Sequence, residues 1–158
     1  PAFADYERLF HTDMMPGLGT VHRFRHFDRI ELVATSLHRF ATVLENDPAY
    51  ANTLWVTHGS RAEIVLGLCA HVNNAANKRS RMGLILTGVP LQGNEPADFV
   101  KQAVVTSDLP VLHAPVRLTD CMARLQGFTS KLNLEDTKRT DRAVAHVREH
   151  IDFDLLLR

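Results

Sequence analysis

The sequence has few of the features that mark membrane, secreted and nucleic-acid-binding proteins. Its 158 residues include only two cysteines, and its 18 basic residues are balanced by 18 acidic ones. A formal net charge of zero provides no long-range attraction to nucleic acid or to an anionic membrane surface. No apolar run approaches the ~18 to 20 residues that cross a bilayer. We therefore expect neither nucleic acid nor a membrane among its partners.

The cysteines and the start of the chain bear on the location of the protein. Cys69 and Cys121 both lie in apolar segments with helical periodicity, so we expect reduced core residues rather than a disulfide or a metal pair. No signal-peptide pattern is present. Both observations predict a reducing, cytoplasmic location. The chain starts at Pro1 without a methionine, and we expect a piece of a longer protein or a processed product.

Several catalytic and metal-binding motifs are missing as well. The sequence has no G-x-x-x-x-G-K-[ST] loop, no H-E-x-x-H and no G-x-S-x-G around Ser60. Ser60, His113 and Asp120 supply the three residue types of a hydrolytic triad, but Ser60 is expected to cap a helix instead. His146 and His150, four residues apart, are interpreted as solvated surface histidines. We predict no catalytic residue, no metal and no cofactor.

The sequence does contain a regular alternation of apolar strands and helices. Continuous apolar runs predict buried strands, and apolar residues at helical spacing predict the segments between them. The strands are predicted over residues 30–34, 53–57, 82–87 and 110–113, and the helices over 61–74 and 137–150 and around 37–44, 99–104 and 118–125. This alternation predicts an α/β fold, a three-layer α/β/α sandwich with a mainly parallel sheet.

Some segments are assigned a place relative to the core. Residues 1–28 are predicted to form an N-terminal arm with one short helix, and residues 20–27 an edge strand or an extended arm. The length of the chain predicts a single globular domain, and residues 29–158 are expected to form its main part. Two helices are expected to turn apolar residues inward: Phe99, Val100, Ala103 and Val104 in one, and Ala143, Val144, Val147 and Ile151 in the other.

The turn after the second predicted strand carries most of the candidate chemistry. Ser60 and Glu63 have the S-x-x-E spacing of a capping box, so we expect Ser60 to cap the following helix. Gly59 allows a ligand to approach the backbone closely. Arg61 can bind an anion in a bidentate manner. The start of a helix is also favourable for an anion because its backbone N–H groups lack partners.

Other polar residues are expected at the same edge of the sheet. Parallel strands place their carboxyl ends together, and small ligands bind at such edges in α/β proteins. We therefore predict a ligand-binding rim composed of Thr57, His58, Gly59, Ser60, Arg61, Thr87, Gly88 and His113.

Two of these strand ends resemble family motifs. Thr57-His58-Gly59-Ser60-Arg61 is similar to a Thr-x-Gly-Asp-Arg turn, and Leu86-Thr87-Gly88-Val89 to a Leu-Thr-Gly-Gly strand end. With these motifs, the chain from about Arg29 to its end resembles the DRTGG domain, the central regulatory domain of long-form bacterial phosphate acetyltransferases. Ser60 replaces the family's aspartate and Val89 its second glycine, so a different effector, or none, is implied for this copy.

The resemblance implies a function that is not catalytic. In those enzymes the domain lies between a P-loop domain and the domain that transfers acetyl between coenzyme A and phosphate. We therefore expect a regulatory domain that binds a small anionic metabolite or nucleotide, forms a homo-oligomer, or does both. The alternatives are a purely structural oligomerisation module and a stand-alone hydrolase that uses Ser60.

Overall fold

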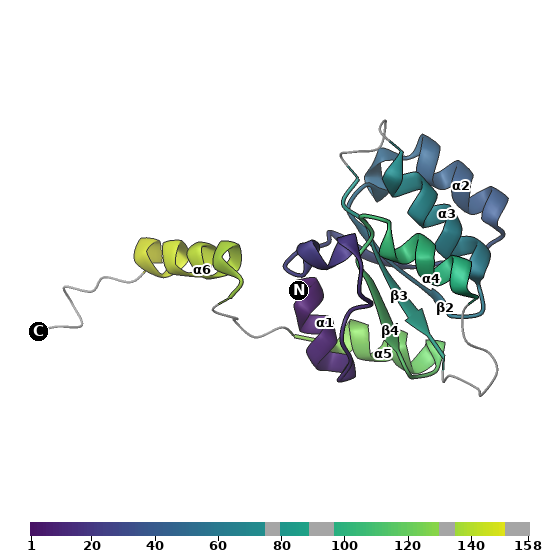
Figure 1. The fold of residues 1–158 in the computed structure, drawn as a ribbon. Helices are drawn as coiled ribbons and strands as arrows, with labels where there is room; N and C mark the ends of the chain where they lie inside the picture. Colours follow the sequence, from purple (N-terminus) through teal and green to yellow (C-terminus); the bar gives the residue numbers. More distant parts are fainter. Residues whose placement is uncertain (75–79, 89–96, 130–134, 151–158) are drawn as a thin grey trace, which may run out of the picture. The chain divides into compact units, whose positions relative to one another are not determined.

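The computed structural model describes residues 1–74, 80–88, 97–129 and 135–150 (Figure 1). Contacts within the chain divide it into two compact units, residues 1–128 and residues 129–158. The predicted division into an arm of residues 1–28 and a domain of residues 29–158 stays a prediction, because contacts do not show which parts fold alone.

The first unit contains a four-stranded sheet with helices on both of its faces. Its elements are α1 (Phe3–Phe10), η1 (Leu18–His22), β1 (Arg29–Leu32), α2 (Leu37–Asn46), η2 (Pro48–Tyr50), β2 (Thr53–His58), α3 (Ala62–Asn73), β3 (Gly83–Thr87), α4 (Asp98–Val105), β4 (Val111–Ala114) and α5 (Leu118–Gly127). The strands are all parallel, in the order β1-β2-β3-β4. Helices α2, α3 and α4 cover one face and α1 and α5 the other (Figure 1). The predicted three-layer α/β fold is confirmed.

The apolar strands supply both halves of the core. Successive side chains of a strand point to opposite faces of its sheet, and in β2 Trp55 packs with α2 and α3 while Leu54 and Val56 pack with α1 and α5. Phe40 meets Trp55 edge to face, with ring centroids 4.9 Å apart. The continuous apolar runs are therefore explained by burial on both sides of the sheet.

The N-terminal segment completes the second layer. Phe3, Tyr6 and Phe10 of α1 are buried against the sheet, and the predicted short helix is present. The buried carboxylates of this helix have hydrogen-bond partners. Asp5 accepts from the backbone N–H of Ala2, the N-cap residue of the helix (2.8 Å). Glu7 accepts from the backbone N–H of Met14 (3.0 Å) and from Nε of Arg23 (2.6 Å). Buried charges need such partners to be tolerated.

The strand or extended arm predicted over residues 20–27 is wrong. Residues Leu18–His22 form the 3-10 helix η1, held by the Thr20 N–H and the Thr20 hydroxyl, which both donate to the carbonyl of Gly17. Only an isolated bridge, between Ala2 and His26, gives this stretch a strand-like contact.

Two of the predicted apolar stripes are also corrected. Val100 and Val104 of α4 are buried, but Phe99 is 63% exposed because the stripe that faces the sheet is narrower than the apolar run. Helix α6 (Thr137–His150), in the second unit, forms as predicted and contains no buried residue, so Val144 and Val147 do not enter a core. Ile151 lies outside the described residues. Asp136 caps α6 by accepting from the N–H of Arg139 (3.2 Å).

The two cysteines are free and buried, as expected. Burial raises the pKa of the Cys121 thiol to about 12, and the pKa of Cys69 is raised for the same reason. Both thiols therefore stay protonated and unreactive near neutral pH. Among the described residues, no helix has the length and apolar character needed to cross a membrane.

Gly19 provides a test of how closely the N-terminal segment packs. A Cβ at this position would overlap the backbone of Leu109 and Pro110. Gly19→Ala should therefore lower the free energy of unfolding by about 1–3 kcal/mol, as overpacking does. Gly127→Ala is the control, because nothing lies within 4 Å of its added Cβ. Urea unfolding of both variants would measure the difference, and equal stabilities would contradict the close contact at Gly19.

Candidate functional site

The structure brings the predicted rim residues to one edge of the sheet. In the register of the parallel strands, His58 lies opposite Thr87 of β3. His113 of β4 lies opposite Leu86, one residue before the end of β3. The turn that follows β2 leads into α3, so the start of this helix is at the same edge.

The two threonines of the rim serve the sheet. Thr57 and Thr87 are both buried. The hydroxyl of Thr57 donates to the carbonyl of Val33 (3.3 Å), and the hydroxyl of Thr87 donates to the carbonyl of Thr57 (3.3 Å). These hydroxyls tie three neighbouring strands together at their ends. The groups that can meet a ligand are therefore the exposed ones next to them.

The turn itself differs from the predicted capping box. The N–H of Gly59 donates to the carbonyl of Thr87 (2.7 Å), and the N–H of Arg61 donates to the carbonyl of His58 (3.0 Å). Because of this turn, α3 begins only at Ala62. Its N-cap residue is Arg61, whose side chain makes no capping hydrogen bond. The cap predicted for Ser60 is wrong because Ser60 precedes the N-cap by one residue.

Ser60 is paired with a histidine instead. Its hydroxyl lies 2.7 Å from Nδ1 of His58, and its backbone N–H donates to the same atom (3.2 Å). A backbone N–H can only donate, so Nδ1 accepts and the Nε2 of this ring carries the proton. Both residues are exposed. The H-x-S spacing of residues 58–60 is the sequence signal that could have indicated this pair.

Arg61 is held by groups of the protein. Its Nη2 donates to the carbonyl of Thr35 (2.7 Å), and its Nε donates to Glu63 (2.5 Å). The hydrogen bond from Arg61 lowers the pKa of the Glu63 carboxyl, which therefore stays ionised. The sequence predicted the arginine at the rim but not the carboxylate that neutralises it.

Gly88 lies between the two histidines of the rim. Its φ of 120° is a conformation that L residues with a side chain rarely adopt. Its carbonyl accepts from Nε2 of His113 (2.9 Å), and its N–H donates to the carbonyl of Val116 (2.9 Å). An added Cβ would lie 2.7 Å from Nε2 of His58. The imidazole of His58 thus packs on a surface that only glycine leaves free, whereas Val89 lies outside the described residues.

The three residue types of a hydrolytic triad are not brought together. Nε2 of His113 is bonded to Gly88, and Ser60 is bonded to His58 instead. Asp120 is an exposed residue in the first turn of α5. The contacts of the described residues therefore give Ser60 a histidine partner but no carboxylate behind it.

Gly88→Ala tests whether this glycine shapes the rim. The positive φ and the contact with His58 should together lower the free energy of unfolding by about 1–2 kcal/mol. The imidazole should also move, which NMR shifts of the His58 ring would report. Gly127→Ala is again the control, because nothing lies within 4 Å of its added Cβ. An unmoved His58 ring in Gly88→Ala would contradict the packing described.

Comparison with known proteins gives a partial match. No family model matches the chain, and no solved structure matches it. Over 130 residues the chain is 25% identical to the phosphate acetyltransferase of Acinetobacter baylyi (strain ATCC 33305 / BD413 / ADP1). This match covers 82% of the chain and 17% of that enzyme. The chain is thus similar to one short segment of a phosphate acetyltransferase.

Proposed function

We propose that the chain is a non-catalytic, DRTGG-like regulatory domain of a phosphate acetyltransferase-like protein and that its rim binds a small anionic metabolite or nucleotide. The observation that carries the proposal is the match to a phosphate acetyltransferase, which takes in 82% of this chain but 17% of the enzyme. A segment of that size, with an α/β fold of its own, fits a domain that accompanies the catalytic one.

The exposed groups of the rim suit an anion. Helix α3 starts at the rim without a side-chain cap, so the positive end of its dipole is directed at the rim. The protonated Nε2 of His58 adds a donor at this place, whereas the hydroxyl of Ser60 donates to Nδ1 of the same ring. Since the family's aspartate is replaced by Ser60, this copy carries one negative charge fewer at the same place.

Arg61 determines how strongly an anion is held. Its guanidinium is already engaged by Glu63 and by a backbone carbonyl. A ligand phosphate would have to share or replace the carboxylate of Glu63. This competition favours a ligand with more negative charge than a single carboxylate, because bidentate arginine–phosphate pairs are strong.

Variants of the Arg61–Glu63 pair would test the anion site. Arg61→Ala should weaken binding, and Glu63→Gln should tighten it about 1.4- to 5-fold, which is the range that an exposed ion pair of 0.2–1 kcal/mol allows. Calorimetric titration with inorganic phosphate, acetyl phosphate and ATP would measure both effects.

The control for this experiment is Arg8→Ala, which removes an exposed arginine from α1. It should leave each affinity unchanged. Affinities that are the same in Arg61→Ala, Glu63→Gln and the parent protein would contradict the assignment of this turn as the anion site.

Self-association is the second function that an observation favours. Helix α6 has no buried residue, and Val144 and Val147, three positions apart on one face, are 44% and 41% exposed. An apolar pair at helical spacing is typical of a face that packs against a partner. We propose that a second copy of the chain covers it.

Sedimentation velocity would test this interface. The double variant Val144→Ser/Val147→Ser should shift the chain towards the monomer, because it removes apolar area without adding charge. Val21→Ser is the matched control, since Val21 is 78% exposed on η1 in the first unit. If the double variant and the control sediment like the parent protein, the face of α6 is not the contact between copies.

A further inference from the structure

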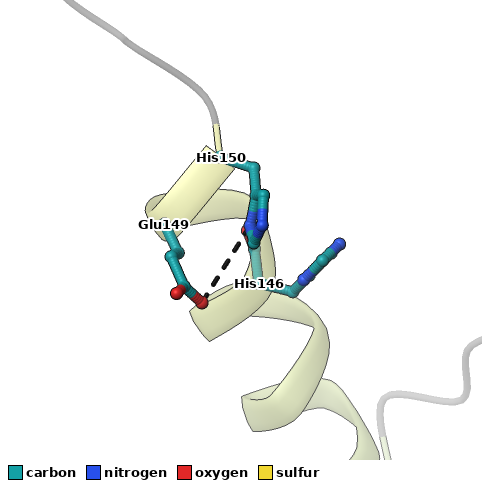
Figure 2. Close-up of side chains that lie close together, drawn as sticks. All are labelled: His146, Glu149 and His150. Carbon is teal, nitrogen blue, oxygen red and sulfur yellow. Dashed lines mark hydrogen bonds and ion pairs between the residues drawn. The ribbon is translucent and has the colours of Figure 1, made fainter.

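The last turn of α6 carries a cluster of metal-ligating side chains that the proposed function does not use. His146, Glu149 and His150 all project from this turn (Figure 2). Each offers one ligand atom, and these atoms lie within 4.8 Å of one another. The two imidazole rings are close, with centroids 4.1 Å apart. Residues four apart share one face of a helix, so the helix itself holds the imidazoles together.

A backbone hydrogen bond prepares one of the rings. Nδ1 of His150 lies 2.9 Å from the carbonyl oxygen of His146. A carbonyl oxygen can only accept, so Nδ1 carries the proton and Nε2 keeps its lone pair. In metal-binding histidines the N–H of the second ring nitrogen commonly donates to a backbone carbonyl in this way, which fixes the tautomer and the orientation of the ring.

The charges of this turn favour a cation. The carboxylate of Glu149 is 4.0 Å from Nδ1 of His150. The turn is the C-terminal end of α6, where the helix dipole is negative and stabilises positive charge. Arg148 is the one basic side chain between the two histidines, and its position two residues after His146 places it on the other side of the helix.

We propose that His146, Glu149 and His150 bind a divalent transition-metal ion, with Zn²⁺ as the ion that the ligands fit. Two imidazoles and a carboxylate are ligands typical of Zn²⁺, whereas Mg²⁺ and Ca²⁺ prefer oxygen alone. The H-x-x-E-H spacing of residues 146–150 is also that of zinc-binding helices. The site is a binding site and not a peptidase centre, because all three side chains are exposed on the helix.

Binding of the metal would be coupled to the helix. None of the residues of α6 is buried, so its helical form is not supported by a core of its own. An isolated helix of such length is marginal in water. The ligands come together only when residues 146 to 150 are helical, so an ion that binds them stabilises the helix by mass action.

Calorimetric titration of the untagged full chain with ZnCl₂ would test the proposal. The parent protein should bind one equivalent. His146→Gln, His150→Gln and Glu149→Gln should each weaken binding at least ~10-fold, which is the lower end of what even the loss of an outer-shell partner costs. Zn²⁺ should also slow amide hydrogen exchange in α6 of the parent protein and leave α6 of the double histidine variant unchanged.

Two controls make the result decisive. MgCl₂ should give no heat of binding, and His38→Gln, which removes an exposed histidine from α2, should bind Zn²⁺ like the parent protein. An affinity that His146→Gln and His150→Gln do not change would overturn the site. A Glu149→Gln variant that binds like the parent would overturn the carboxylate as a ligand. All the substituted side chains are exposed, so thermal melting should confirm that each variant stays folded.

Discussion

The parallel pairing of β2 with β3 is the constraint on which the rim depends. The pairing continues beyond the end of β2, because the N–H of Gly59 donates to the carbonyl of Thr87. This bond brings the turn against the end of β3, sets the start of α3 at Ala62 and places the ring of His58 over Gly88. Both strands are buried on their two faces, and a shift of one residue would exchange the side chains that pack in the two layers, so the packing of both layers keeps the register fixed.

The sequence predicts most of the fold because the fold depends on apolar periodicity. Strands covered on both faces must be continuously apolar, and helices on a sheet need only one apolar stripe. Prediction fails where backbone hydrogen bonds decide. In η1 the carbonyl of Gly17 receives two bonds from Thr20, and the result is a 3-10 helix rather than a strand. The apolar side chain of Phe99 also leads to a wrong prediction of burial, because this residue lies at the edge of the apolar stripe and faces water.

The candidate site is predicted less well for a related reason. The residue types at strand ends do not show which hydroxyls bond within the sheet and which face solvent. The hydroxyls of Thr57 and Thr87 are buried and bond within the sheet. The S-x-x-E pattern is compatible with a capping box, but Ser60 and Glu63 each bond to a residue two positions away. Such local pairs compete with capping and depend on where the turn ends, which the pattern does not contain.

These local pairs determine what the rim offers to a ligand. The positive charge of Arg61 is met by Glu63, so the net charge of the turn is close to zero when His58 is neutral. In the proposed anion site, attraction then depends on oriented dipoles, namely the positive end of α3 and the N–H at Nε2 of His58, more than on a free cation. The field of a dipole falls off faster with distance than the field of a charge. Such groups therefore attract a ligand that fits closely and have little effect on charges farther away. The proposed anion site is therefore suited to select by shape, and the exposed pair of His58 and Ser60 is part of that shape.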